Sequence, residues 1–337
     1  MRIALVSDAW RPQMNGVVRT LTKTTAELQA LGHDVHTITP EPYPSIACPT
    51  YPEIRLALVS GRRIAEALEA SSPDAIHIST EGPLGIAVRR YCLRRGLAFT
   101  TAFHTRFPEY VWARFRVPLR LTYAFLRRFH GAGQALMVAT PAVERELARR
   151  GFRNLRRWTR GVDADLFSPD RRGDWSELPR PIFLTVGRLA VEKNIAAFLD
   201  LDLPGCKVVV GDGPQLAELR RRYPKALFIG KREGEELARC YAAADVFVFP
   251  SRTDTFGLVL LEALAAGVPV AAYPVAGPID VIGDAPVGRL DQDLRRAALQ
   301  CLDVPRKACR EYALKFSWRA SAEQFLCNLV PVSGAVG

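Results

Sequence analysis

The chain has 337 residues, of which 48% are hydrophobic and 24% are charged, and its formal net charge is +11. This length exceeds one ordinary domain and predicts two. No apolar run approaches the ~20 residues needed to cross a bilayer, and the sequence opens on a strand-like run, residues 3–6, without a basic and apolar leader. We therefore expect a globular protein of the cytoplasm.

The seven cysteines are scattered along the chain and form no Cys-x-x-Cys pair. This pattern argues against a disulfide framework and against a zinc site. We expect the cysteines to be small buried hydrophobic residues.

The positive charge is concentrated in the first half. Residues 1–165 carry 24 Lys and Arg against 14 Asp and Glu, whereas residues 166–337 carry 22 against 21. Ten arginines lie between residues 89 and 128, with Glu109 as the one acid among them. The first half is therefore expected to meet an anionic partner.

Apolar, strand-like runs alternate with helical patterns in both halves. The runs of the first half are 3–7, 35–39, 74–79, 97–103 and 135–140, with helical patterns such as 20–31 and 61–70 between them. The second half repeats the scheme at 181–187, 207–211, 226–230, 245–249 and 268–272. This alternation predicts an α/β fold with a doubly wound parallel sheet in each half. We predict domains at 1–168 and 181–318, a polar linker rich in Gly and Pro at 169–180, and a final helix within 319–337.

Ligands of such sheets bind at the carboxyl ends of the strands. In the first half, Gly16 lies between the first strand and the first helix, Glu81 follows the third strand, and His104 follows the fourth. A glycine there can let the backbone approach a phosphate, or it can simply form a turn. An isolated histidine is usually structural, but its place at a strand end favours a binding residue.

The second half opens its first loop with Gly187, Arg188 and Lys193. Two cations five residues apart can close on a diphosphate from two directions, Arg188 as a bidentate donor and Lys193 as a compact charge. The alternative is a solvated charged loop. Such cations can stabilise negative charge that develops on a leaving diphosphate.

Two carboxylates mark the segment 251–269. Asp254 follows the apolar run 246–250, and Glu262 lies about two turns down a predicted helix that ends at Gly267. The loop offers N–H groups and a helix dipole to an anion, while the carboxylates can accept hydrogen bonds from hydroxyls. This combination suits a sugar nucleotide. The alternative is that Asp254 caps the helix and Glu262 faces solvent.

Two further patterns suggest other chemistry at first sight. Gly211 and Gly213 begin like a dinucleotide fingerprint, but Leu216 occupies the position of the third glycine. Asp163 and Asp165 form an Asp-x-Asp pair that could hold a divalent metal in another fold. We predict neither a nicotinamide cofactor nor a metal site.

A basic amphipathic segment follows His104. Its cations are Arg114, Arg116, Arg120, Arg127 and Arg128, and bulky apolar residues alternate with them. Such a segment is typical of a surface that lies on an anionic membrane, where each charge contributes about 1 kcal/mol. The alternatives are a core-packed helix with a solvated arginine face and a nucleic-acid surface, although no nucleic-acid-binding motif accompanies the charge.

The segment 251–269 resembles the Glu-x7-Glu signature of retaining glycosyltransferases of family 4, which have the GT-B fold. The matching residues are Phe256, Gly257, Glu262, Ala263, Gly267, Pro269 and Val270. Asp254 departs from the pattern, since the family has Glu there. The Gly-Arg-x4-Lys run 187–193, the Gly-Asp-Gly-Pro run 211–214, the stretch 160–169 that contains Asp163, and the stretches around Gly16, Glu81 and His104 also match, so that the resemblance covers nearly the whole chain.

This resemblance implies two Rossmann-like domains that face a cleft, with the C-terminal helix packed back on the first domain. It implies a retaining, metal-independent hexosyltransferase with a nucleoside diphosphate sugar as co-substrate and no other cofactor, a UDP sugar being favoured over a GDP sugar. Bacterial diacylglycerol glycosyltransferases and related mannosyl- and sulfoquinovosyltransferases show the nearest likeness. The expected acceptor is therefore diacylglycerol or a glycolipid, and the expected location is peripheral, on the inner face of the cytoplasmic membrane.

The resemblance also assigns roles to individual residues. Arg188, Lys193, His104 and Asp254 are the expected catalytic residues, and Glu81 and Tyr110 are placed on the acceptor side. The expected donor-binding residues are Gly16, Gly187, Gly211, Gly213, Phe256, Gly257, Leu258 and Glu262.

Two alternatives remain open from the sequence. One is a transferase with a soluble or polysaccharide acceptor. The other is a catalytically silent GT-B protein whose basic face binds membrane or nucleic acid. We expect no nucleic-acid partner, and the sequence predicts no oligomeric state.

Overall fold

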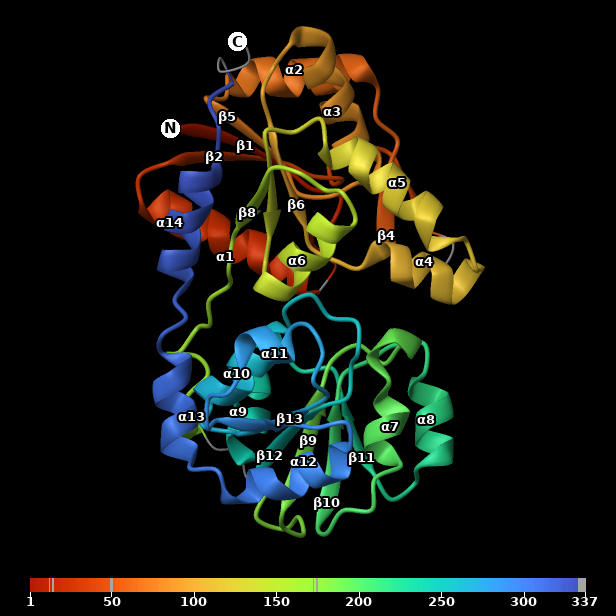
Figure 1. The fold of residues 1–337 in the computed structure, drawn as a ribbon, viewed down its shortest axis with the longest axis vertical. Helices are drawn as coiled ribbons and strands as arrows, with labels where there is room; N and C mark the ends of the chain where they lie inside the picture. Colours follow the sequence, from red (N-terminus) through yellow and green to blue (C-terminus); the bar gives the residue numbers. More distant parts are fainter. Residues whose placement is uncertain (12, 14, 49–50, 172, 174, 333–337) are drawn as a thin grey trace. The chain divides into compact units, whose positions relative to one another are not determined.

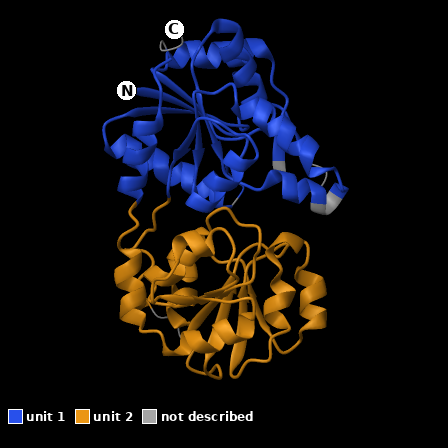
Figure 2. Cartoon of the chain, in the orientation of Figure 1, with its two compact units in different colours: residues 1–159, 318–337 blue, residues 160–317 orange. Residues whose placement is uncertain are grey.

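The computed structural model describes residues 1–332 except 12, 14, 49, 50, 172 and 174, and for residues 48, 51–54, 113 and 114 it describes the backbone alone. The chain forms two compact units (Figure 2). Unit 1 comprises Met1–Thr159 and Trp318–Gly337, and unit 2 comprises Arg160–Ser317. Each unit is built on one six-stranded sheet.

The sheet of unit 1 has the order β2-β1-β5-β6-β7-β8, and all of its strand pairs are parallel (Figure 1). Its strands are β1 (Arg2–Val6), β2 (Asp34–Ile38), β5 (Ala75–Ile78), β6 (Thr100–Phe103), β7 (Ala135–Val138) and β8 (Leu155–Arg157). An antiparallel hairpin of β3 (Ser45–Cys48) and β4 (Tyr51–Ala57) stands apart from this sheet.

The helices of unit 1 connect these strands. They are α1 (Gly16–Ala30), α2 (Gly61–Ser71), α3 (Pro83–Arg95), α4 (Phe107–Phe115), α5 (Leu119–His130), α6 (Pro141–Arg149) and α14 (Trp318–Asn328). Helix α14 lies beside α1 (Figure 1). Its Phe325 packs against Trp158, with ring centroids 4.9 Å apart, and both side chains are fully buried. The end of the chain therefore completes the core of unit 1.

The sheet of unit 2 has the order β11-β10-β9-β12-β13-β14 and is also wholly parallel. Its strands are β9 (Ile182–Val186), β10 (Cys206–Val210), β11 (Leu227–Gly230), β12 (Val246–Phe249), β13 (Val270–Ala272) and β14 (Gly288–Leu290). Every residue of β12 is buried. Such continuous apolar strands are expected where helices cover both faces of a parallel sheet.

Short helices connect the strands of unit 2. The α-helices are α7 (Ile195–Leu199), α8 (Leu216–Arg222), α9 (Gly234–Ala243), α10 (Leu258–Ala265), α11 (Pro278–Val281), α12 (Leu294–Gln300) and α13 (Arg306–Ala313). Three 3-10 turns accompany them, η1 (Pro169–Arg171), η2 (Val191–Lys193) and η3 (Cys301–Asp303). The predicted fold class, two parallel-sheet α/β domains, is confirmed.

The chain passes between the units at residues 159–160 and 317–318. Residues 169–180, the predicted linker, pack in unit 2 together with residues 160–168. Arg171 pairs with Glu235 of α9 at 3.1 Å, and the N–H of Gly173 donates to the carbonyl of Arg239. A polar stretch rich in Gly and Pro therefore serves here as a surface loop of one domain.

Candidate active site

An open parallel sheet binds its ligands at the carboxyl edge, where the order of the strands reverses. In unit 2 the reversal lies between β9 and β12, which are neighbours although two strands separate them in sequence. Arg188 and Lys193 follow β9, and Asp254 follows β12. In unit 1 the reversal lies between β1 and β5, which precede Gly16 and Glu81 respectively.

The two loops at the reversal in unit 2 are bound to each other by side chains. Lys193 Nζ donates to Asp254 Oδ1 at 2.5 Å, and the two side chains are only 26% and 16% exposed. Asn194, with a φ of 53°, donates through its side-chain amide to the carbonyl of Pro250 at 3.1 Å. The hydroxyls of Ser251 and Thr253 donate to the carbonyl of Glu192. The structure thus brings together two predicted catalytic residues, which form a half-buried ion pair.

Arg188 is half-buried in the same loop as Lys193. An anion that enters here meets a guanidinium and an ammonium, and the ammonium already has a carboxylate partner. Sugar hydroxyls that donate to Asp254 would compete with Lys193 for its oxygens, and phosphate oxygens would compete with Asp254 for Lys193. The arrangement can therefore exchange an internal ion pair for contacts with both halves of a sugar diphosphate.

Gly211 and Gly213 allow the loop after β10 to lie directly on the loop after β9. A Cβ at Gly211 would lie 1.8 Å from the carbonyl oxygen of Gly187, and one at Gly213 would lie 2.5 Å from that of Leu189. The N–H of Leu189 donates to the carbonyl of Asp212 across the same contact. These glycines are thus required for packing between the loops, whether or not they also contact a nucleotide.

Helix α10 begins immediately after the Asp254 loop. Gly257 has a φ of 84° and precedes Leu258, the first residue of the helix, while Phe256 is buried. The N-cap position of α10 is Gly257, so that Asp254 is not the capping residue. Glu262 is only 5% exposed, and its Oε2 accepts a hydrogen bond from the hydroxyl of Tyr241 at 2.9 Å. The alternative of a capping Asp254 and a solvent-facing Glu262 is therefore wrong.

Asp8 connects the two loops at the reversal in unit 1. Its carboxylate accepts hydrogen bonds from the N–H groups of Leu84 and Gly85, at 2.8 and 3.2 Å, and from the hydroxyl of Thr80 at 2.9 Å. Burial raises the pKa of Asp8, and these hydrogen bonds oppose the rise. Asp8 thereby occupies the N-terminus of α3.

Gly16 is the exposed first residue of α1. The side-chain oxygen of Asn15 accepts hydrogen bonds from the N–H groups of Val17 and Val18, both at 3.0 Å. An N-cap of this kind satisfies donors of the first turn that would otherwise lack partners.

His104 and Glu81 each contact a buried side chain behind the carboxyl edge of the sheet. The ring of His104 packs against Trp158, with centroids 5.5 Å apart and an angle of 76° between the planes. Glu81 Oε1 lies 3.1 Å from Nε2 of the buried His130, whose Nδ1 contacts the hydroxyl of Thr101. Tyr110 lies half-buried in α4.

The arginine-rich segment forms two helices, α4 and α5, because the chain turns at Arg116, which has a φ of 54°, and continues through Pro118. One face of α5 is buried through Tyr123, Leu126, Phe129 and His130. We call the exposed side chains of α4 and α5 together the docking surface. From α4 and its end it has Trp112, Phe115 and Arg116, and from α5 it has Arg120, Leu121, Phe125, Arg127 and Arg128. The side chain of Arg114 lies outside the described residues.

A partly buried ion pair and a partly buried hydrogen bond fix α4 to its neighbours. Arg106 pairs with Glu146 of α6 at 2.7 Å, and the hydroxyl of Tyr123 donates to Glu109 at 2.6 Å. Burial would raise the pKa of Glu146, but the hydrogen bonds and charge of Arg106 and Arg150 lower it below its usual value. The exposed aromatic residues of α4 therefore project from an anchored helix.

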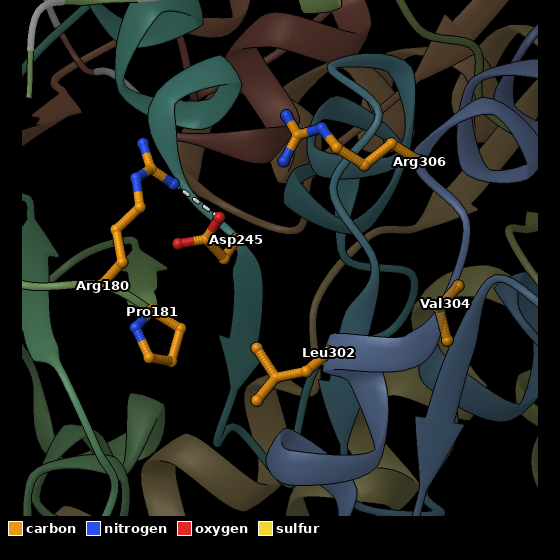
Figure 3. A pocket seen from close by; sticks show the side chains of 6 residues that line it. All are labelled: Arg180, Pro181, Asp245, Leu302, Val304 and Arg306. Carbon is orange, nitrogen blue, oxygen red and sulfur yellow. Dashed lines mark hydrogen bonds and ion pairs between the residues drawn. The ribbon is translucent and has the colours of Figure 1, made fainter. Parts of the chain in front are cut away.

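Unit 2 has a cavity of about 390 Å³ (Figure 3). It lies where β9 and β12 begin, rather than at the loops that follow these strands. Arg180 and Asp245, which precede β9 and β12, line it and form an ion pair at 2.5 Å. Arg306 lines it as well and donates to the carbonyls of Ala242, Ala244 and Ala266. Both guanidinium groups are thus used in holding the fold together.

Asp163 has a local structural role. Its carboxylate accepts a hydrogen bond from the N–H of Leu166 at 3.0 Å, which closes a turn. Among the residues that the structure describes, no three His, Cys, Asp or Glu side chains form a group suited to a metal ion. Over the same residues, no helix is long and apolar enough to cross a bilayer.

Known proteins are similar to this chain in sequence and in fold. The model of Glycosyltransferase Family 4 matches residues 14–166, and that of Glycosyl transferases group 1 matches residues 180–303. The sucrose-phosphate synthase of Thermosynechococcus elongatus superposes with a TM-score of 0.76 over 96% of this chain and 97% of that one, at 24% identity. The fold is thus the GT-B fold of nucleotide-sugar glycosyltransferases.

Two curated relatives are similar over most of their length. A GDP-mannose-dependent alpha-mannosyltransferase of Mycobacterium tuberculosis is 30% identical and covers 99% of this chain, which in turn covers 97% of the relative. An alpha-monoglucosyldiacylglycerol synthase of Streptococcus pneumoniae is 26% identical over 96% of this chain and 83% of its own length. The chain belongs to glycosyltransferase family 4 and transfers a sugar from a nucleotide sugar.

Proposed function

We propose that this glycosyltransferase moves a hexose, with retention of anomeric configuration and without a metal ion, from a nucleoside diphosphate sugar to a membrane lipid. The observation that carries the proposal is the pairing of Lys193 with Asp254 at the strand reversal of unit 2, with Arg188 in the same loop. Cations there suit the diphosphate, and the carboxylate suits the sugar hydroxyls.

In this proposal the acceptor hydroxyl attacks the anomeric carbon from the face that the leaving group vacates. A new C–O bond forms as the bond to the diphosphate oxygen breaks, and that oxygen takes the proton of the hydroxyl. Arg188 and Lys193 stabilise the charge that develops on the diphosphate. His104, Glu81 and Tyr110 of unit 1 belong to the sugar and acceptor side.

The identity of the donor is part of the proposal. The family resemblance favours a UDP sugar, whereas the mannosyltransferase relative is named for GDP-mannose, so both donors are needed in the first trial. The acceptor class rests on the relative named for diacylglycerol and on the docking surface, where cations and aromatic residues lie together. Such a surface suits the anionic inner face of the cytoplasmic membrane.

The decisive experiment incubates the purified full chain with GDP-mannose or UDP-glucose and phosphatidylglycerol vesicles that contain diacylglycerol. We expect release of the nucleoside diphosphate, together with a glycolipid that mass spectrometry detects. Release that requires a polysaccharide in place of the vesicles would favour the soluble-acceptor alternative. Turnover of neither donor with any acceptor would favour a silent binding protein.

The docking surface gives a second test. Replacing both Phe115 and Leu121, which are 58% and 56% exposed, by serine should weaken binding to phosphatidylglycerol vesicles about 10- to 100-fold, because two apolar side chains no longer enter the lipid. Sedimentation at low ionic strength measures the binding.

The matched control is Leu314→Ser, since Leu314 is 54% exposed and lies in unit 2. This variant should bind vesicles like the unaltered protein. High salt should release the unaltered protein by screening the arginines. If the double variant sediments as well as the control, the docking surface does not contact the membrane.

A further inference from the structure

Tyr241 is a buried residue that contacts the predicted nucleotide-binding carboxylate. It lies on α9, whereas Glu262 lies on α10, and its hydroxyl donates to Glu262 Oε2 at 2.9 Å. The tyrosine side chain has no exposed surface, and Glu262 is nearly as deeply buried. The contact thus joins two helices behind the Asp254 loop.

The ring of Tyr241 is held on two sides. Phe167 meets it at 5.6 Å between centroids and nearly perpendicular, at 83°, and Phe247 of β12 lies at 5.6 Å with an angle of 57°. A ring packed in this way keeps its hydroxyl at a fixed place. The orientation of the Glu262 carboxylate is therefore set by the core of unit 2.

A carboxylate on a helix can rotate about its side-chain bonds, and a buried one needs donors wherever it points. Charge-assisted hydrogen bonds are the strong ones, so the hydroxyl of Tyr241 favours one orientation over the others. A ligand that is bound by Glu262 then meets an acceptor that is already in place, which lowers the entropy cost of binding.

We propose that Tyr241 is a positioning residue that orients Glu262 toward the ribose hydroxyls of the bound nucleoside diphosphate. The inference rests on the proposed function and on the expected donor-binding role of Glu262, which we assign to hydrogen bonds accepted from the ribose hydroxyls. Tyr241 acts through Glu262 and does not touch the nucleotide itself. Its contribution should thus depend on the presence of ribose hydroxyls in the ligand.

The test compares Tyr241→Phe with the unaltered protein in calorimetric binding of GDP and of 2′,3′-dideoxy-GDP, with UDP and its dideoxy form in parallel. The variant removes one oxygen and keeps the ring. We expect it to weaken binding of the ribonucleotide about tenfold and binding of the dideoxynucleotide less than about twofold. In turnover, KM for the donor should rise about tenfold while kcat changes less than about threefold.

Tyr312→Phe is the matched control. Tyr312 is half-buried in the same unit, and its hydroxyl donates to the carbonyl of Val281 at 2.8 Å, so its removal also deletes one partly buried hydrogen bond. It should leave the affinity for both nucleotides unchanged. In a protein that already carries Glu262→Gln, the addition of Tyr241→Phe should weaken binding of the ribonucleotide by less than about twofold further, because the two residues act as a unit.

Equal weakening of both nucleotides by Tyr241→Phe would show a general structural role and overturn the inference, as would no weakening of either. If Tyr241→Phe weakens binding of the ribonucleotide selectively but the unaltered protein transfers no sugar, the proposed function fails while this inference stands. If the unaltered protein binds no nucleoside diphosphate, both are wrong.

Discussion

Lys193→Ala is expected to lower kcat about 100- to 1,000-fold, because the departing diphosphate loses a cation that is held in place before the reaction begins. In the structure Lys193 is held by its hydrogen bond to Asp254, and η2 places it at the strand reversal of unit 2. Steady-state rates at saturating donor and acceptor measure the effect. Lys193→Arg should retain more activity than Lys193→Ala, since it keeps the charge in a different shape.

Removal of Lys193 also leaves the Asp254 carboxylate without its ion-pair partner. Thermal unfolding should therefore be followed in parallel, and the double variant Lys193→Ala with Asp254→Asn should recover stability without recovering kcat. Lys231→Ala is the control, because Lys231 is an exposed lysine of the same unit that pairs with Glu233. A kcat for Lys193→Ala equal to that of the control would contradict the assigned role.

Gly85→Ala should lower the free energy of unfolding by about 3 kcal/mol or more, which corresponds to a fall in Tm of roughly 10 °C. A Cβ at this third residue of α3 would lie 1.9 Å from the carbonyl oxygen of Thr80 and 3.2 Å from Ile78. Because the first obstacle is backbone, the helix or the loop after β5 must move. Asp8, which accepts from the N–H of Gly85, would be displaced as well.

Gly61→Ala is the matched control for this substitution. Gly61 is the first residue of α2 in the same unit, and a Cβ there would meet nothing within 4 Å. We expect no loss of stability, and a small gain is consistent with the higher helix propensity of alanine. Calorimetry or denaturant unfolding measures the stability of the two variants. If both are equally stable, the loop after β5 moves aside for the new methyl group without a loss of folding free energy.

The sequence alone predicted the two parallel sheets, because short apolar runs that alternate with helical patterns leave few other arrangements. It missed β8 and β14, each only three residues long, and the hairpin of β3 and β4. The basic amphipathic pattern predicts one continuous segment, because arginines and bulky apolar residues alternate throughout residues 114–129. The break near Pro118 was a visible signal for two helices.

The candidate site was predicted in part, and much of it rested on the family resemblance. The pattern of apolar runs showed that the segments with Arg188, Lys193 and Asp254 follow strands. The ion pair between Lys193 and Asp254 could not be predicted from this pattern, because it depends on β12 lying beside β9. The sequence pattern did not indicate Tyr241 or His130 as site residues. Each lies far in sequence from the carboxylate that it contacts, which is Glu262 for Tyr241 and Glu81 for His130. Asp8 lies two residues after the end of β1, and this position at a strand end was a signal that could have indicated it.

The path of the chain through unit 1 has a consequence for how the protein folds during synthesis. The whole of unit 2 is translated before α14, whose Phe325 packs on Trp158 and whose Gln324 accepts from the N–H of Thr159. Unit 1 therefore leaves the ribosome first but completes its core last. Until α14 arrives, the indole of Trp158 lacks one of its aromatic neighbours, and His104 packs against that same indole. The half of the protein that emerges first thus acquires its final stability only after α14 has been translated.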